Sequence, residues 1–249
     1  MLDHIKIENI LFLDIETVPQ YPDLKEASEK FREFWDKKST YFRDENQTSE
    51  DVYQRAGIYS EFGKIICISA GFFVVKNGEK KLRLKSFFGD DEKKILEEFS
   101  AMLQKFNASN SDLLLCAHNG KEFDFPYISR RMLINGLSLP KILDIAGKKP
   151  WEVNFLDTME LWKFGDYKNY TSLNLLTHVF NIPTPKDDID GSMVADVYWK
   201  EKNINRIVTY CEKDVLAVAQ LILRYKGQDI LNMENVDSVT FSGESSSGE

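Results

Sequence analysis

The sequence has no long apolar run and few cysteines, and both shortages restrict what the protein can be. No stretch approaches the roughly 18 uninterrupted apolar residues of a membrane-spanning helix, and the N-terminus lacks a signal-peptide pattern. The three cysteines, Cys67, Cys116 and Cys211, lie in apolar segments without C-x-x-C spacing. We therefore expect reduced core cysteines rather than a disulfide or zinc site, and a cytoplasmic protein without membrane contact.

Basic residues are also in deficit. The 32 Lys and Arg are outnumbered by 40 Asp and Glu, which gives a formal net charge of −8. Proteins that hold a nucleic-acid duplex tightly usually present a broad positive surface, whereas here only local basic clusters exist, at 80–83 and 130–131. We interpret both clusters as solvated surface. Bound metal ions would supply positive charge locally, so a short or single-stranded anionic ligand fits this composition better than a duplex.

Apolar residues are abundant enough for one large domain, at 43% of 249 residues. The continuous apolar run at 10–15 is typical of a central strand buried on both faces. Further strands are predicted at 64–75, 81–88, 113–117 and 153–157, with a hairpin turn at 76–79, and helices near 91–106, from about 125, and over most of the chain to 226. This order predicts an α/β protein in three layers, with a mixed central sheet of about five strands and helices on both faces.

Two segments differ from this pattern. Residues 20–62 are charged and helical in pattern, with an apolar stripe that includes Phe31 and Trp35, and we interpret them as an insertion over the edge of a site rather than a separate domain. Residues 227–249 are predicted to form a C-terminal extension, and its last eight residues, 242–249, have the composition of a flexible tail.

Asp14 and Glu16 close the first strand and are the first candidate functional residues. The two residues are two positions apart on an extended strand, so their side chains point to the same side. The two carboxylates therefore repel one another unless a cation lies between them. Thr17 follows and can offer its backbone N–H or its hydroxyl to a ligand oxygen. The structural alternative is a pair of solvated acids where the strand leaves the sheet.

The second candidate group lies between a predicted strand and a predicted helix. Asp124 precedes Pro126, so a helix N-cap is the structural alternative to a functional role. Asn119 and Gly120 are typical turn residues. Phe123 is either a core residue or an apolar wall against which a base stacks.

The third group lies on the last long helix. Tyr210 and Asp214 are four apart and therefore share a face, at the border of the apolar stripe, while Glu212 and Lys213 are expected to face water. An ordinary boundary tyrosine and a surface acid are the alternative. Three further acids, Asp157, Asp190 and Asp196, are interpreted as structural. Asp157 closes a short predicted strand and could also support a metal site by contacting the residues that bind the metal.

Together these groups supply four carboxylates and a tyrosine from three distant segments, which is the oxygen-rich set that two neighbouring divalent cations need. The set resembles the exonuclease domains of the DEDD superfamily, in the branch with tyrosine in its third motif (DEDDy), as in family B DNA polymerases. The motifs Asp-x-Glu, Asn-x-x-x-Phe-Asp and Tyr-x-x-x-Asp occur in this order at 14–16, 119–124 and 210–214 without substitution. The resemblance covers residues 10 to about 226 and is closest to stand-alone, polymerase-B-like predicted 3′–5′ exonucleases. The 20–62 insertion and the absence of a polymerase domain depart from the pattern.

The resemblance implies a ribonuclease H-like fold and a single two-metal 3′–5′ exonuclease domain at 1–226. It implies two cofactor ions, Mg²⁺ or Mn²⁺, with Asp14, Glu16, Asp124 and Asp214 as ligands and Tyr210 orienting the attacking water. Thr17, Asn119 and Phe123 are then the substrate-binding candidates. The expected substrate is a single-stranded 3′ end, DNA before RNA, with nucleoside 5′-monophosphates as product and a repair or replication partner acting in trans.

Three alternatives remain open. A ribonuclease H-like endonuclease also needs clustered carboxylates but has no use for Tyr210. A non-catalytic nucleic-acid-binding module on the same fold is the second, although such modules are expected to lose a ligand and all four carboxylates are present here. The third is a structural protein whose acids are helix caps and surface charge.

Overall fold

A mixed sheet of six strands forms the centre of the molecule, in the order β5-β4-β1-β2-β3-β6. The computed structural model describes residues 1–76, 78–166, 170–183 and 189–241. The strands are β1 (Ile10–Pro19), β2 (Gly63–Lys76), β3 (Glu79–Phe88), β4 (Leu114–Ala117), β5 (Phe155–Asp157) and β6 (Val236–Ser238). β2 runs antiparallel to β1 and to β3, whereas β4 and β5 continue the sheet parallel to β1 and β6 runs parallel to β3. The α/β fold with a mixed sheet is confirmed, and β6, from the C-terminal extension, adds a strand beyond the five expected.

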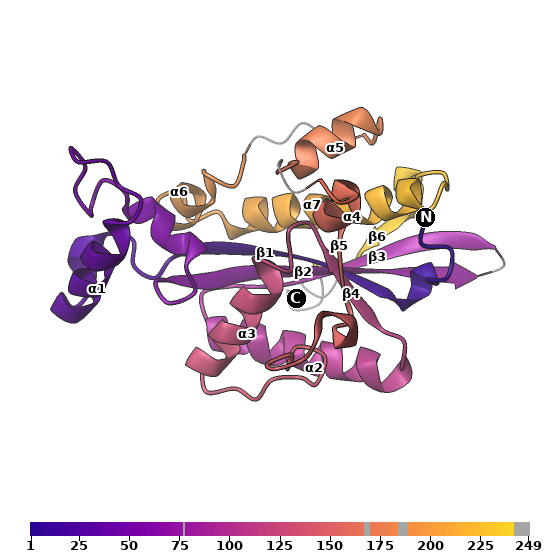
Figure 1. Ribbon diagram of the computed structural model, residues 1–249, viewed down its shortest axis with the longest axis horizontal. Helices are drawn as coiled ribbons and strands as arrows, with labels where there is room; N and C mark the ends of the chain where they lie inside the picture. The colour runs from indigo at the N-terminus through magenta and orange to yellow at the C-terminus, as the bar shows by residue number, and fades with distance from the viewer. Residues whose placement is uncertain (77, 167–169, 184–188, 242–249) are drawn as a thin grey trace, which may run out of the picture.

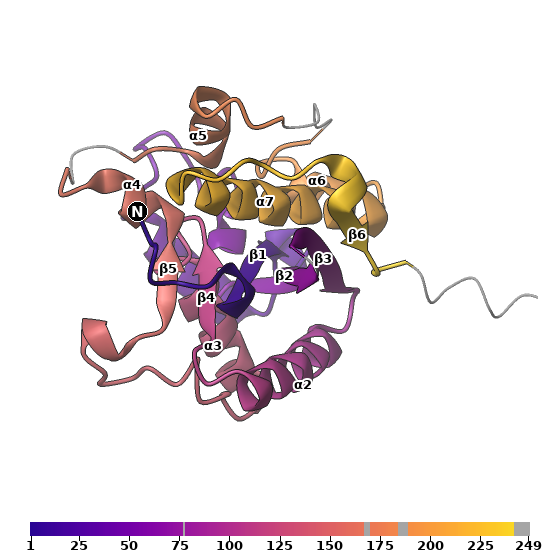
Figure 2. The same ribbon diagram turned by 90° about the vertical axis from the view of Figure 1, so that its right-hand side faces the viewer.

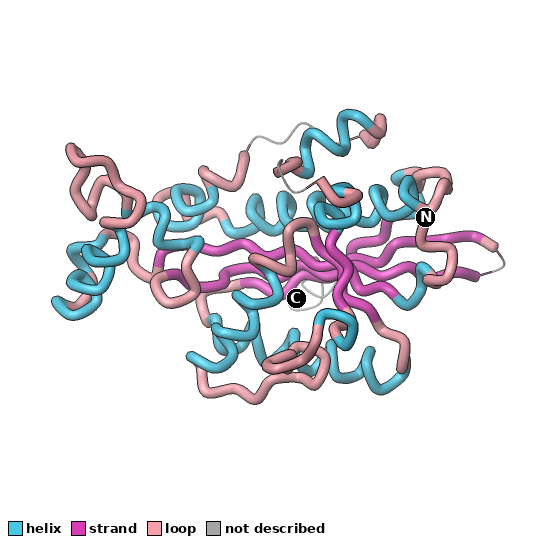
Figure 3. Tube along the Cα trace, in the orientation of Figure 1, coloured by secondary structure: helices cyan, strands magenta, loops and turns pink. Residues whose placement is uncertain are grey.

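Helices cover both faces of this sheet (Figures 1 and 2). Helices α2 and α3 lie against one face, while α7 lies along the other with α4, α5 and α6 around it; Figure 3 shows the strands between these two helical layers. The helices are α1 (Glu29–Ser39), α2 (Glu92–Ser109), α3 (Asp124–Ile134), α4 (Thr158–Lys163), α5 (Leu173–Val179), α6 (Val194–Trp199) and α7 (Ile204–Tyr225). Short 3-10 turns are η1 (Ile7–Asn9), η2 (Leu24–Glu26), η3 (Tyr53–Ile58), η4 (Pro150–Glu152) and η5 (Met233–Asn235).

The alternation of side chains along β1 determines which helical layer each residue meets. Leu11, Leu13 and Ile15 are buried against α2 and α3, whereas Ile10 and Phe12 are buried against α7. Asp14 and Glu16 continue the second series and therefore point towards α7. A register shift between Glu16 and Thr17 ends this regular alternation near the carboxyl end of the strand.

The segment 20–62 has a small aromatic core of its own. Trp35 is fully buried, its indole N–H donates to the Ser49 carbonyl at 2.8 Å, and rings of Phe42, Tyr53 and Phe62 surround it. The segment is tied to the sheet through η3, which packs along β1. Figure 1 shows α1 lying beyond the end of the sheet, beside the carboxyl end of β1.

Two surface assignments from the sequence are wrong. Arg131 is only 5% exposed, because it lies on the inner face of α3 and its guanidinium binds both carboxylate oxygens of the buried Glu92. Glu212 does not simply face water, since its carboxylate accepts hydrogen bonds from Ser86, Ser238 and Thr240 and so joins α7 to β3 and the β6 segment. Asn77 of the predicted hairpin turn and the tail at 242–249 lie outside the described residues. Among the helices of the described ranges, none combines the length and apolar character needed to cross a membrane.

Candidate active site

The first and third motifs meet where β1 passes under α7. A carboxylate oxygen from Asp14, one from Glu16 and the Cys211 sulfur all lie within 4.8 Å of one another. From the same helix, the Tyr210 hydroxyl hydrogen-bonds the Asp214 carboxylate, and Asp214 is close enough to Asp14 and Glu16 to repel both electrostatically. The strand period of two thus brings Asp14 and Glu16 to one side, and the helix period of about four does the same for Tyr210 and Asp214. Both pairs meet at the same point.

Asp124 reaches the same point from the opposite helical layer. β4 pairs with β1 only as far as Phe12, so the backbone N–H of Ile15 has no partner in β4. The Asp124 carboxylate accepts that N–H at 3.2 Å. The N-cap position of α3 belongs to Phe123, which makes no side-chain cap bond. Asp124 is therefore not the helix N-cap, which was the structural alternative to a functional role.

The assembled carboxylates hold their protons abnormally tightly. Burial and then the charges of Asp214, Glu16 and Asp124 raise the pKa of Asp14 well above its usual range, and burial with the Asp214 charge does the same to the pKa of Glu16. Burial raises the pKa of Asp124 to about 7, even though its bond from Ile15 favours the charged form. A cluster of this kind is strongly destabilised when ionised unless positive charge enters it.

Cys211 is a site neighbour that the sequence patterns do not reveal as such. The residue is fully buried, and its thiol lies 3.2 Å from Asp14 Oδ2 and 3.4 Å from the Asp14 carbonyl oxygen. Burial raises the pKa of this thiol, so it is a neutral S–H donor to the carboxylate rather than a thiolate. The only available sequence signal is its place between Tyr210 and Asp214, which an apolar-stripe interpretation hides.

The three predicted substrate-binding residues have different contacts, and only Thr17 and Phe123 line the pocket next to the carboxylates. Thr17 uses its hydroxyl to donate to the Gly57 carbonyl at 2.8 Å. Asn119 has a left-handed backbone with φ of 61°, and its buried side-chain oxygen has no hydrogen-bond partner in the described protein. Phe123 is partly buried, with its ring 5.3 Å from that of Tyr127.

The three additional acids have structural contacts, as interpreted. Asp157, 2% exposed, accepts the backbone N–H groups of Asn119, Lys121, Met159 and Glu160. It thereby fixes the loop that leads to Asp124 and caps α4. Asp190 accepts from Ser192, and Asp196 pairs with Lys200 at 2.9 Å.

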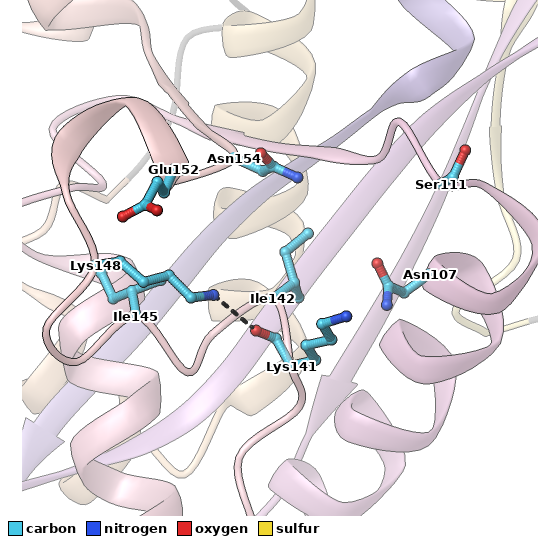
Figure 4. A pocket seen from close by; sticks show the side chains of 8 residues that line it. All are labelled: Asn107, Ser111, Lys141, Ile142, Ile145, Lys148, Glu152 and Asn154. Carbon is cyan, nitrogen blue, oxygen red and sulfur yellow. Dashed lines mark hydrogen bonds between the residues drawn. The ribbon is translucent and has the colours of Figure 1, made fainter.

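A pocket of about 400 Å³ adjoins the carboxylates, and its lining includes Glu16, Thr17 and Phe123 together with Arg55 and Ile58 of the 20–62 segment. A second hollow of about 410 Å³ is lined by Lys141, Lys148 and Asn154, among others, and Figure 4 shows both lysine side chains turned towards its centre. Asn154 precedes β5, so this hollow lies at the amino end of the parallel strands. Sites in such sheets form at the carboxyl ends, and none of the three motifs contributes to the second hollow.

Comparison with known proteins places the chain with a nuclease family. A family model described as a predicted 3′–5′ exonuclease related to the exonuclease domain of PolB matches residues 58–241. Asp124, Tyr210 and Asp214 lie inside this range, whereas Asp14, Glu16 and most of the 20–62 segment precede it. No curated protein matches the chain.

Proposed function

The chain belongs to the family of predicted 3′–5′ exonucleases related to the exonuclease domain of PolB, and from this we propose that it hydrolyses the terminal phosphodiester bond at the 3′ end of a single strand, with two divalent cations. The observation that carries the proposal is the meeting of Asp14, Glu16, Asp124, Tyr210 and Asp214 at one point. DNA is favoured over RNA, and nucleoside 5′-monophosphates are the product.

The carboxylates fit divalent cations chemically. Oxygen ligands of full negative charge are what Mg²⁺ and Mn²⁺ bind, and the pKa values of Asp14, Glu16 and Asp124 are raised by burial and, after it, by negative neighbours without compensating positive charge. We assign Asp14, Glu16 and Asp214 to one ion and Asp14 with Asp124 to the other. When bound, such cations activate water and stabilise the charge that develops on the leaving 3′ oxygen.

Tyr210 positions the attacking water rather than deprotonating it. Burial and the Asp214 charge raise the pKa of the Tyr210 hydroxyl well above its ordinary value, so it stays protonated at neutral pH. Its O–H donates a hydrogen bond to the Asp214 carboxylate, which leaves the oxygen lone pairs to orient water towards the phosphorus. The S–H of Cys211 holds Asp14 in one rotamer, and Asp157 holds the loop that leads to Asp124.

The surroundings of the carboxylates support a single strand as the substrate. The adjoining pocket of about 400 Å³ is a suitable size for one terminal nucleotide, and Phe123 offers it an aromatic wall. A net charge of −8 disfavours a long duplex footprint. A cytoplasmic location and a replication or repair partner in trans remain predictions of this proposal.

The test is digestion of 5′-labelled single-stranded DNA and RNA of matched sequence in Mn²⁺. The wild type is compared with the Asp14→Ala/Glu16→Ala double variant and with Asp3→Asn, which removes an exposed charge outside the three motifs. We expect a ladder that shortens from the 3′ end, absent in the double variant and unchanged in Asp3→Asn. Digestion that persists in the double variant overturns the proposal, and internal cleavage indicates a ribonuclease H-like endonuclease instead.

A further inference from the structure

The lining of the pocket beside the carboxylates comes from four separate parts of the chain. Glu16 and Thr17 belong to β1, Phe123 precedes α3, Arg55 and Ile58 come from the 20–62 segment, and Ser192 precedes α6. Arg55 precedes the residues that match the family model. The pocket next to the motif residues is therefore lined in part by the 20–62 segment, most of which precedes the matched range.

The wall from the 20–62 segment is fixed rather than loosely apposed. The Gly57 carbonyl accepts hydrogen bonds from the Thr17 and Tyr127 hydroxyls, both at 2.8 Å. Gly57 packs so closely on β1 that an added Cβ would lie 3.2 Å from the Val18 carbonyl carbon. The Gln54 amide, which also lines the pocket, donates to Asp196 of α6 at 3.2 Å. These contacts hold η3 in a fixed position relative to Glu16.

Arg55 is the only basic residue among the described residues that line this pocket. Its guanidinium carbon lies 4.3 Å from the centre of the Phe42 ring, which supports one face of the group and leaves the in-plane N–H donors at its edge available. Within the described ranges Arg55 forms no ion pair with a carboxylate, in a chain where acids outnumber bases. No carboxylate of the described residues therefore neutralises its charge.

We infer that Arg55 is a substrate-binding residue, whose guanidinium binds a backbone phosphate of the strand whose terminal nucleotide occupies this pocket. The inference rests on the proposed function for the identity of the ligand. A guanidinium matches phosphate geometry with two parallel N–H donors, and a cation at this wall balances the repulsion between the strand and the carboxylates. The 20–62 segment thus contributes directly to recognition of the 3′ end.

The test measures binding and turnover separately. Binding of a 5′-fluorescein single-stranded DNA is followed by anisotropy in Ca²⁺ at several salt concentrations, and KM and kcat are then measured in Mn²⁺. The variants are Arg55→Gln, which keeps much of the packing on Phe42, Arg55→Lys, which restores the charge, and Lys25→Gln as the control. Lys25 lies on the same segment in an exposed pair with Glu50, so its substitution removes an equal charge outside the pocket.

We expect Arg55→Gln to weaken binding and raise KM about 10-fold, with kcat nearly unchanged. The slope of log affinity against log salt should fall in magnitude by about 0.7, as for one lost phosphate contact on a single strand. Arg55→Lys should recover most of the slope, and Lys25→Gln should match the wild type. If the wild type digests the strand, but Arg55→Gln binds it with unchanged affinity and an unchanged salt slope, the inference is wrong and the proposed function stands. Binding without digestion overturns the proposed function alone, and absence of both overturns both.

Discussion

Replacing Asp124 with asparagine should stabilise the metal-free protein while removing its activity. The folded state raises the pKa of this carboxyl from 3.8 to about 7, because burial and neighbouring acids disfavour its charge. A pKa raised on folding means that ionisation costs stability as the pH rises between the two values. Asparagine keeps an oxygen in the position that accepts the Ile15 N–H, so the substitution removes the charge without orphaning that donor.

The magnitude follows from the size of the shift. A change of roughly three pKa units corresponds to about 4 kcal/mol, fully expressed above pH 7. At pH 5 the folded-state carboxyl of Asp124 is protonated, and the penalty falls to about 2 kcal/mol. Asp124→Asn should therefore gain about 4 kcal/mol at pH 8 and about half of that at pH 5. Removing the Asp124 charge also lowers the electrostatic cost of ionising Asp14 and Glu16, which adds to the gain in the free energy of unfolding.

The assay is urea unfolding followed by tryptophan fluorescence in EDTA at pH 5 and pH 8. Asp3→Asn is the control, because the Asp3 side chain is 89% exposed and should show no difference at either pH. Added Mn²⁺ should stabilise the wild type more than Asp124→Asn, since ligand binding to the folded state adds RT ln(1 + [L]/Kd) and the variant lacks a ligand. If Asp124→Asn is no more stable than the wild type at pH 8, or gains equally at both pH values, the electrostatic account of this cluster is wrong.

Three further outcomes are expected. Tyr210→Phe should retain a measurable fraction of the activity that Asp14→Ala loses almost entirely, because positioning of water is less essential than a metal ligand; equal losses in a turnover assay contradict this. Cys211→Ala should raise the Mn²⁺ concentration that gives half-maximal thermal stabilisation by about 10-fold, as outer contacts of metal ligands do, and Cys211→Ser should largely restore it. Arg131→Met should cost about 3–5 kcal/mol in urea unfolding, since it leaves the Glu92 carboxylate buried without its partner; Glu92→Gln/Arg131→Met should recover part of this loss.

Short-range periodicity accounts for what could be predicted about the candidate site. Asp14 and Glu16 share a side because a strand repeats every two residues, and Tyr210 and Asp214 share a side because a helix nearly repeats every four. The alternation and length of the apolar runs likewise predicted the strands and the two helical layers, apart from β6. Three residues, Val236–Ser238, are too few and too polar to show a strand pattern of their own, and they join the sheet by pairing with the edge of β3.

The sequence by itself therefore determined the order of elements, the three motifs and the family. Tertiary structure decided which helical layer each motif faces and what surrounds it. The Cys211 thiol meets Asp14 across 197 residues and Asp124 meets Ile15 across 109, and no local pattern records either contact. The place of Arg55 beside the pocket depends in the same way on Gly57 packing against β1 and on Gln54 reaching Asp196. Such contacts depend on how separate elements pack, and packing joins residues whose spacing in the chain carries no periodic signal.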